Sequence, residues 1–296
     1  MRTGRTLGIA GVGLIGASIG LRAAAFGYEV HGWDPSSDHL ACALERGAIA
    51  VAEPDVAALG RTCETLVIAA PLDATLALLA AYAVVPPCAG LVIDVASVKI
   101  PVARVGAALA CFVATHPMAG SDRSGPSAAS AELFVDRVWT YDANASGPLA
   151  DRACAFIAEM GARPVAIASD EHDRVVALTS HLPQVLAVVL GARLGARQGD
   201  AYVDALCGSG MASMLRLGGS AWTVWRAILE ANGSAVAQEV RGVADVLLAV
   251  AGDLEAQRSG ALAELFAASA AAVVRLRANE ALAEHVELAK PVSDER

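Results

Sequence analysis

Short apolar runs alternate with helix-period segments through the first 168 residues of the chain. The runs predict β-strands at Leu7–Ala10, Glu29–Trp33, Leu66–Ala69, Leu91–Val95, Phe112–Thr115, Trp139–Tyr141 and Pro164–Ala168. Most are followed by a turn rich in Gly, Pro or Ser, or by a segment with apolar positions at helical spacing. Strands that alternate with helices form βαβ units, so we expect an α/β Rossmann domain over residues 1–168, built on a doubly wound parallel sheet.

The pattern changes after Ser169. From there to about Asn279 the sequence shows only helix-period stretches interrupted by glycines, which predicts an all-α domain over residues 169–296. The helices from Ser220 onward are rich in Ala, Val and Leu, so we expect them to be buried on more than one side. Such an apolar helical domain predicts a homodimer that packs through these C-terminal helices.

The first helix of this all-α domain has a predicted start and a predicted bend. Ser169 is the expected N-cap, with Asp170 and Glu171 in the first turn, where the helix dipole favours carboxylates. Pro183 should bend the helix just after His181, because proline deletes one internal hydrogen bond.

A glycine-rich segment follows the first strand and opens a helix. Gly11 permits the tight turn, Gly13 lets the backbone approach a pyrophosphate, and Gly16 allows close packing of helix on strand. The helix N-terminus presents free N–H groups to the phosphates. The predicted cofactor-binding residues in this segment are Gly11, Gly13, Leu14, Ile15 and Gly16.

Two further residues complete the predicted cofactor site. Asp34 ends the second strand, where a carboxylate accepts hydrogen bonds from the adenosine ribose and repels a 2′-phosphate. The residues after it, 35–37, include no arginine to compensate, so NAD is favoured over NADP. Pro71, after the Leu66–Ala69 strand, is also assigned to the site. A glycine turn without ligand and an FAD site stay open as alternatives.

His116 is the candidate for acid–base chemistry. It follows an expected strand and so lies at the carboxyl edge of the sheet, where ligands of open α/β folds bind. A loop histidine there can be neutral near pH 7 and can accept a proton from a substrate hydroxyl. A purely structural histidine is the alternative that position alone leaves open.

With these segments the chain resembles the prephenate/arogenate dehydrogenase family of tyrosine biosynthesis. The joint pattern is specific, although each segment alone is a weak signal. The matching segments, in the family's order and spacing, are Gly11–Ser18, Asp94–Lys99, His116–Gly120, Ser124-Gly125, Leu133-Phe134, Trp139, Glu171–Arg174, Ser180–Pro183, Arg216 and Trp225-Arg226.

The resemblance implies an NAD-dependent oxidative decarboxylation of a cyclohexadienol, either prephenate to 4-hydroxyphenylpyruvate or arogenate to tyrosine. By the resemblance, the catalytic residues are His116, which accepts the ring hydroxyl's proton, and Ser97, which fixes the same hydroxyl. Arg216 would clamp a substrate carboxylate with two parallel hydrogen bonds. A serine that satisfies the loop backbone and a solvated surface arginine are the alternatives for Ser97 and Arg216.

His181 is a further candidate for the substrate pocket, since it lies beside the expected bend. It follows His172 by nine residues, which places the two on opposite sides of one regular helix (9 × 100° = 900°). We therefore expect His172 to pack or cap, and we predict no metal site.

Ser121 and Asp122 complete the predicted substrate-binding set. Some family members have a glutamate and a lysine where this chain has Asp122 and Ala212. An unpaired acidic group near the substrate side chain suits the ammonium of arogenate better than the keto acid of prephenate. The residues after Asn279 are too few for a fused mutase or regulatory module, so we expect any feedback by tyrosine to act at the substrate site or an interface.

Composition narrows the classes further. The 296 residues carry 22 Lys+Arg against 31 Asp+Glu, a net charge of −9, and 55% are hydrophobic. This excludes a disordered chain and argues against a nucleic-acid partner. The uncharged stretch 74–93 contains Pro86-Pro87, so we expect a helix, a loop and a strand there and no membrane partner. The six cysteines form no CxxC pair, which is typical of a reduced cytoplasmic protein.

Three other functions are weighed. A 3-hydroxyacid dehydrogenase uses a lysine of its helical domain, whereas here the only lysine after residue 168 is Lys290. A non-catalytic NAD-binding regulator is expected to lose His116 or Arg216, and both are present. A dehydrogenase for an amino analogue of prephenate, in specialised metabolism, stays open.

Overall fold

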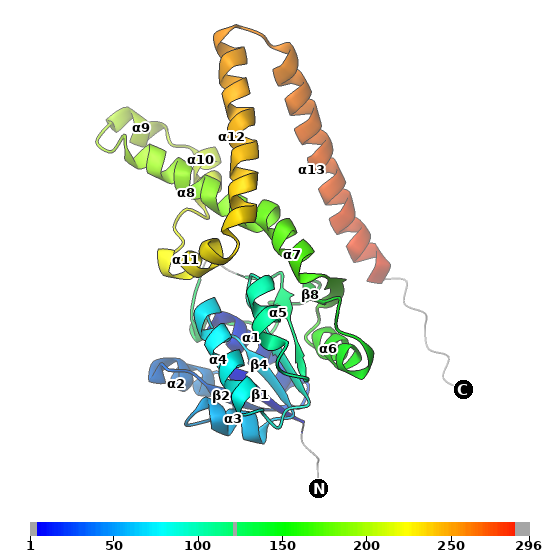
Figure 1. Cartoon of the computed structure of the whole chain (residues 1–296). Helices are drawn as coiled ribbons and strands as arrows, with labels where there is room; N and C mark the ends of the chain where they lie inside the picture. Colours follow the sequence, from blue (N-terminus) through cyan, green and yellow to red (C-terminus); the bar gives the residue numbers. More distant parts are fainter. Residues whose placement is uncertain (1–4, 121–122, 288–296) are drawn as a thin grey trace. The chain divides into compact units, whose positions relative to one another are not determined.

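The computed structural model of the chain describes residues 5–120 and 123–287 (Figure 1). These residues group into two compact units, which comprise residues 1–236 and residues 237–296 of the chain. Each unit is described by itself.

The main sheet of the first unit has six strands in the order β3-β2-β1-β4-β5-β6, and every neighbouring pair is parallel. The strands are β1 (Thr6–Ala10), β2 (Glu29–Trp33), β3 (Val51–Ala52), β4 (Thr65–Ile68), β5 (Leu91–Asp94) and β6 (Phe112–Val113). This order confirms the predicted doubly wound Rossmann sheet. The edge strand β3 was not predicted, because two residues do not make an apolar run.

A second sheet of three strands follows β6. Its strands are β7 (Thr115–Pro117), β8 (Val138–Asp142) and β9 (Arg163–Ile167); β7 is antiparallel to β8, and β8 is parallel to β9. The single strand predicted at Phe112–Thr115 is therefore wrong. The chain changes sheets there because both the N–H and the hydroxyl of Thr115 bond to Asp94 at the end of β5. As a result, His116 lies within β7 and not in a loop.

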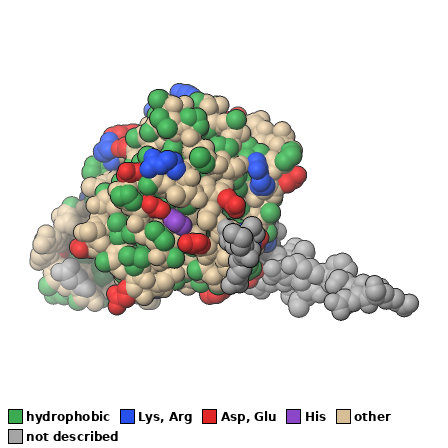
Figure 2. Space-filling model, turned by 90° about the horizontal axis from the view of Figure 1, so that it is seen from below, with side chains coloured by type: hydrophobic (Ala, Val, Ile, Leu, Met, Phe, Trp, Pro, Cys, Tyr) green, Lys and Arg blue, Asp and Glu red, His purple; other side chains and the backbone are tan. Residues whose placement is uncertain are grey.

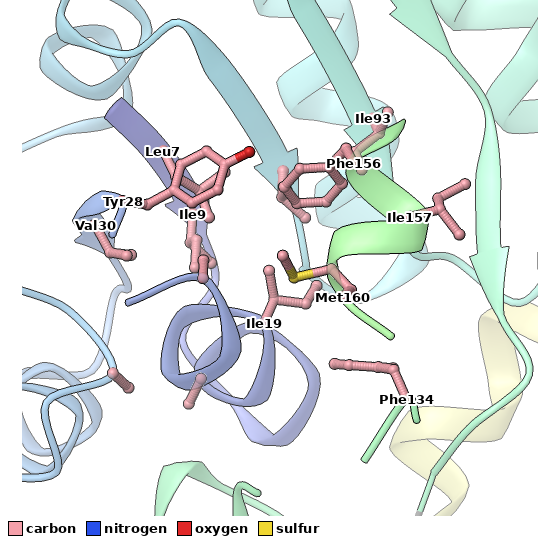
Figure 3. Close-up of a cluster of buried hydrophobic side chains, with 14 of the residues drawn as sticks. Leu7, Ile9, Ile19, Tyr28, Val30, Ile93, Phe134, Phe156, Ile157 and Met160 are labelled. Carbon is pink, nitrogen blue, oxygen red and sulfur yellow. The ribbon is translucent and has the colours of Figure 1, made fainter. Parts of the chain in front are cut away.

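Helices cover both faces of the main sheet (Figure 1). They are α1 (Leu14–Ala25), α2 (Ser37–Glu45), α3 (Val56–Thr62), α4 (Leu72–Val84), α5 (Ile100–Gly106) and α6 (Gly147–Glu159). Successive strand residues point into two separate apolar clusters, as Val67 and Leu66 of β4 do. Figure 3 shows the cluster in which Ile19 of α1 and Phe156 of α6 meet β1. The α/β core therefore has one apolar layer on each side of the sheet.

One continuous helix contains the predicted bend. It runs through α7 (Ser169–Val176), a π-helical turn η2 (Ala177–His181) and α8 (Leu182–Gly195). The π turn ends two residues before Pro183. Proline has no N–H to donate, and its ring clashes with the carbonyl four residues earlier, at Thr179, so the preceding turn widens. The distortion predicted at this position is thus a π turn, which inserts one extra residue into the helix.

The start of this helix differs from the prediction by one residue. Ala168 occupies the N-cap position, and the hydroxyl of Ser169, the first helical residue, donates to Asp142 at 3.1 Å. Among the described residues, Ser169–Gly195 is the one helix whose length and composition would allow it to cross a membrane. It also carries buried polar side chains with partners inside the unit, which is typical of a core helix.

The remaining helices confirm an all-helical C-terminal region. They are α9 (Ala201–Leu206), α10 (Ser209–Leu215), α11 (Trp222–Ala231), α12 (Gly233–Glu255), which continues into the second unit, and α13 (Gly260–Glu287). The expectation that the last helices are buried on several sides is wrong for the single chain, since Leu248 and Phe266 are 73% and 76% exposed. The predicted domain boundary at residue 168 lies at the start of α7 and stays a prediction.

Figure 2 shows one face of the molecule by side-chain type. Lys and Arg side chains form separate spots on this face, interspersed with Asp and Glu. Among the described residues drawn there, no continuous positive surface gathers, which agrees with the acidic net charge of −9.

Candidate active site

The glycine-rich loop between β1 and α1 has the geometry of a dinucleotide loop. Gly11 has a φ of +98°, and a Cβ there would lie 2.4 Å from the carbonyl oxygen of Ala69. A Cβ on Gly16 would lie 1.9 Å from the carbonyl oxygen of Gly11, so only glycine lets α1 pack this closely on the loop. Gly13 has no atom within 4 Å of its Cβ position, which leaves the loop open where α1 begins. The loop therefore leaves space at Gly13 for the pyrophosphate of a dinucleotide.

Asp34 holds this loop from the end of β2. Its carboxylate accepts hydrogen bonds from the backbone N–H of Val12 and of Ser36, both at 2.9 Å, and its side chain is only 9% exposed. His39 of α2 approaches the same carboxylate at 3.3 Å and was missed by the sequence analysis. Each carboxylate oxygen has a second lone pair, so Asp34 can still accept a ribose hydroxyl.

The other predicted cofactor residues lie at the carboxyl ends of β1 and β4, which are neighbours in the sheet. Leu14 and Ile15 form the first turn of α1, and Pro71 is the N-cap residue of α4. The three residues therefore line the same edge of the sheet as the glycine loop.

A buried ion pair joins the end of β5 to the start of β7. The Asp94 carboxylate, fully buried, accepts hydrogen bonds from Lys99 Nζ and from the N–H groups of Ala96 and Thr115. Lys99 Nζ also donates to the Thr115 carbonyl oxygen at 2.6 Å. Burial lowers the pKa of Lys99, and the Asp94 charge opposes this shift. The pair thereby fixes the loop that carries Ser97, which is partly exposed, beside the strand that carries His116.

His116 is the end of a chain of three hydrogen-bonded side chains. Its Nδ1 lies 2.9 Å from Nε2 of His172, and Nδ1 of His172 lies 2.8 Å from Oδ1 of Asp173. The Asp173 carboxylate also accepts the N–H groups of Lys99 (2.6 Å) and Ile100 (2.8 Å). Helix α7 is therefore bonded directly to the N-cap and the first residue of α5, just after the loop that carries Ser97.

The surroundings of His116 keep it neutral. Burial lowers its pKa well below the ordinary 6.5, and the positive charge of Lys99 lowers it further, followed by His172 and His181. A histidine with such a depressed pKa is unprotonated near pH 7 and can accept a proton. The electrostatics thus agree with the predicted role of a general base.

His181 is buried beside the same network. Its Nδ1 lies 3.2 Å from Nδ2 of Asn232, and the Trp225 ring packs edge-on against it with centroids 5.8 Å apart. Its Nε2 is buried and has no partner among the described residues. Burial lowers the pKa of His181 to about 4.

The prediction that His172 and His181 face opposite sides of the helix is wrong. The π turn between them inserts one residue, so the regular 100° step fails there. Both histidines instead lie near His116, since a positive charge on either ring would lower its pKa. His172, expected to pack or cap, is hydrogen-bonded to the candidate base itself.

Arg216 is exposed, in the turn after α10. Gln184 ties this turn to α8 by donating to the Leu217 carbonyl oxygen at 2.8 Å, one helical turn beyond His181. In the part of the chain that the structure describes, Arg216 and His116 share no hydrogen bond. Ser121 and Asp122 lie outside the described residues.

The described residues contain no group of three or more His, Cys, Asp or Glu side chains arranged to hold a metal ion. Sequence reasoning gave no role to Asn232 or to Asp94, Lys99 and Asp173, although the last three lie in segments that carry the family resemblance. Their spacing gave no signal, because His116 and His172 are 56 residues apart and meet only in the folded chain.

Comparison with known proteins identifies the family. The family model for the nucleotide-binding domain of prephenate dehydrogenase matches residues 17–165, and that for its dimerization domain matches residues 168–268. The chain belongs to the prephenate dehydrogenase family. It is 32% identical to the probable prephenate dehydrogenase NovF of Streptomyces niveus over 269 residues. This match covers 88% of this chain and 72% of that protein.

Other members of the prephenate dehydrogenase family agree with this assignment. The prephenate dehydrogenase of Bacillus subtilis is 29% identical over 242 residues, which is 77% of this chain and 64% of that protein. A crystal structure of prephenate dehydrogenase from A. aeolicus, in complex with hydroxyphenyl propionate and NAD+, superposes with a TM-score of 0.84 at 20% identity, over 92% of this chain and 98% of that one. Synechocystis arogenate dehydrogenase superposes with a TM-score of 0.76 at 24% identity, over 92% and 99%. At these identities the two superpositions establish a common fold.

The depressed pKa of His181 predicts a loss of stability in mild acid. Between about pH 6.5 and 4 the unfolded chain protonates this histidine and the folded chain does not. The unfolded state therefore binds more protons, and the free energy of unfolding decreases as the pH is lowered. His181→Gln should flatten this fall by up to about 1.4 kcal/mol per pH unit. Denaturant titrations of both proteins between about pH 5 and 7 measure the difference; parallel curves would contradict the burial argument.

Proposed function

We propose that this chain is an NAD-dependent prephenate dehydrogenase, which oxidatively decarboxylates prephenate to 4-hydroxyphenylpyruvate, and that it also or preferentially converts arogenate to tyrosine. The observation that carries the proposal is His116, a histidine held neutral by burial and by Lys99. It lies in β7 of the second sheet, directly after Thr115, which bonds to Asp94 at the end of β5 in the sheet that bears the dinucleotide loop. Membership of the prephenate dehydrogenase family supports the reaction class.

The proposed reaction assigns a step to each site residue. Nε2 of His116 accepts the proton of the ring hydroxyl as hydride leaves the ring carbon that bears this hydroxyl. Cleavage of the bond between the ring and its carboxylate then releases carbon dioxide and makes the ring aromatic. Ser97 holds the same hydroxyl. Arg216 pairs with a substrate carboxylate, and His181 lines the substrate pocket. When bound, NAD supplies the hydride acceptor.

Asp34 supports NAD over NADP. Its carboxylate is already fixed by two backbone N–H groups, so it cannot turn away from a 2′-phosphate. Repulsion between the two anions then disfavours NADP. The preference for arogenate is supported only by the sequence, through the acidic Asp122.

We also propose a homodimer formed through the C-terminal helices. The match to the family's dimerization domain supports it, as do exposed apolar residues on α12 and α13 such as Leu248, Phe266 and Val274. Single chains rarely expose apolar side chains in such number without a partner. Light scattering should give twice the chain mass of 30.1 kDa; a mass of one chain at micromolar concentration would contradict the dimer.

Steady-state assays test the reaction directly. Purified protein with NAD should form reduced nicotinamide, read near 340 nm, from prephenate or arogenate, and the two kcat/KM values assign the preference. NADP should give a lower kcat/KM than NAD because of Asp34. Turnover of neither substrate, by protein shown to bind NAD, would overturn the proposal and favour the amino analogue of prephenate or a non-catalytic regulator.

Removing the base separates catalysis from binding. His116→Asn should lower kcat by about 10²–10⁴-fold, the usual contribution of general base catalysis, and should leave the Kd for NAD unchanged. Fluorescence titration with NAD and initial rates measure both quantities. Normal turnover by this variant would show that His116 is not the base.

A further inference from the structure

Two buried polar residues beside His116 have no role in the reaction as proposed. His172 and Asp173 are each only 1% exposed, yet they form an unbroken hydrogen-bonded line to the base. Buried polar groups of this kind are costly unless they are fully paired, and a paired network fixes the positions of its hydrogens. The direction of each hydrogen bond can therefore be read along the line.

At one end of the line, the Asp173 carboxylate can only accept hydrogen bonds. Its two carboxylate oxygens accept the backbone N–H groups of Lys99 (Oδ1) and Ile100 (Oδ2), so both oxygens act as acceptors. Nδ1 of His172, 2.8 Å from this carboxylate, must therefore carry a hydrogen. In the neutral ring, Nε2 of His172 is then a lone-pair acceptor.

The next bond sets His116. Its Nδ1 lies 2.9 Å from that acceptor, so it must carry the hydrogen and donate it. Nε2 of His116 is left with a free lone pair. Without an acceptor at Nδ1, the ring could place its hydrogen on Nε2, where it would block proton uptake from the substrate.

We propose that His172 and Asp173 are positioning residues, which hold His116 in the one neutral tautomer whose Nε2 can accept the substrate's proton. The proposal rests on the function proposed above, and neither residue touches the reacting atoms. Because Asp173 also bonds the loop after Ser97, one carboxylate orients the base and the hydroxyl-binding loop together.

The same reading gives His181 the opposite tautomer. Nδ2 of Asn232 donates to the Asp173 carbonyl oxygen at 2.7 Å, which fixes the orientation of the amide, and its second hydrogen faces Nδ1 of His181 at 3.2 Å. His181 therefore carries its hydrogen on Nε2, the buried atom without a partner among the described residues. The neutral ring of His181 therefore has its donor at Nε2, the atom at which the neutral ring of His116 has its acceptor.

Nuclear magnetic resonance of the full chain with ¹⁵N-labelled histidine tests the tautomers without an activity readout. We expect the hydrogen on Nδ1 in His116 and His172, and on Nε2 in His181, with His116→Asn and His181→Gln used to assign the signals. In His172→Phe, which removes the acceptor, the His116 signals should shift toward the Nε2–H form. A hydrogen on Nε2 of His116 in the unmodified chain, or a doubly protonated His172, would overturn the proposal.

Kinetics give a second, independent readout. His172→Phe should lower kcat by about 10²-fold, with KM changed by less than about threefold, because the base is present but misoriented. His172→Gln, whose carbonyl oxygen can accept from Nδ1, should recover part of the loss. His31→Phe, the same change in a histidine of β2 that bonds Glu53, is the matched control and should keep the full kcat.

The two proposals can fail separately. A chain that turns over neither substrate but shows the Nδ1–H form of His116, dependent on His172, would support the positioning role of His172 and overturn the proposed function. Normal kcat in His172→Phe, or equal losses of kcat in the Phe and Gln variants, would overturn the positioning role of His172 and leave the proposed function standing. If His172→Phe does not fold, the tautomers of the unmodified chain and the rate of His172→Gln still decide.

Discussion

The buried ion pair between Asp94 and Lys99 is the interaction on which the site depends. It joins the end of β5 in the main sheet to Thr115, the first residue of the second sheet, and it fixes the loop between its own two partners. Loss of either partner would leave an uncompensated buried charge, which typically costs about 3–5 kcal/mol. The pair restricts how far the loop that carries Ser97 can move relative to the strand that carries His116.

The same lysine shapes the chemistry. Burial, together with its ammonium, keeps the pKa of His116 below the ordinary value, which favours the unprotonated ring at neutral pH. Asp173 works from the other side, since it bonds the backbone at Lys99 and, through His172, the ring of His116. Two carboxylates on different elements therefore hold one base from two directions, and their charges are satisfied by backbone N–H groups and the lysine.

The helix that carries Asp173 shows how a local distortion can serve a site. Pro183 prevents regular α-helix over the preceding turn, and the resulting π turn rotates His181 relative to His172. Both rings thereby come within electrostatic reach of the base. In a regular helix the two rings would face opposite sides.

The sequence by itself determined the parallel sheet, the glycine loop, the acidic residue after β2 and the family, because alternation of apolar runs and local motifs depend on neighbours in the chain. It also located His116 and the helix distortion at Pro183. Only the tertiary structure decided that the chain changes sheets at Thr115, that His172 is hydrogen-bonded to His116, and that apolar residues of the last helices are exposed. Those outcomes depend on contacts between residues tens of positions apart, or on a partner, and no local pattern records them.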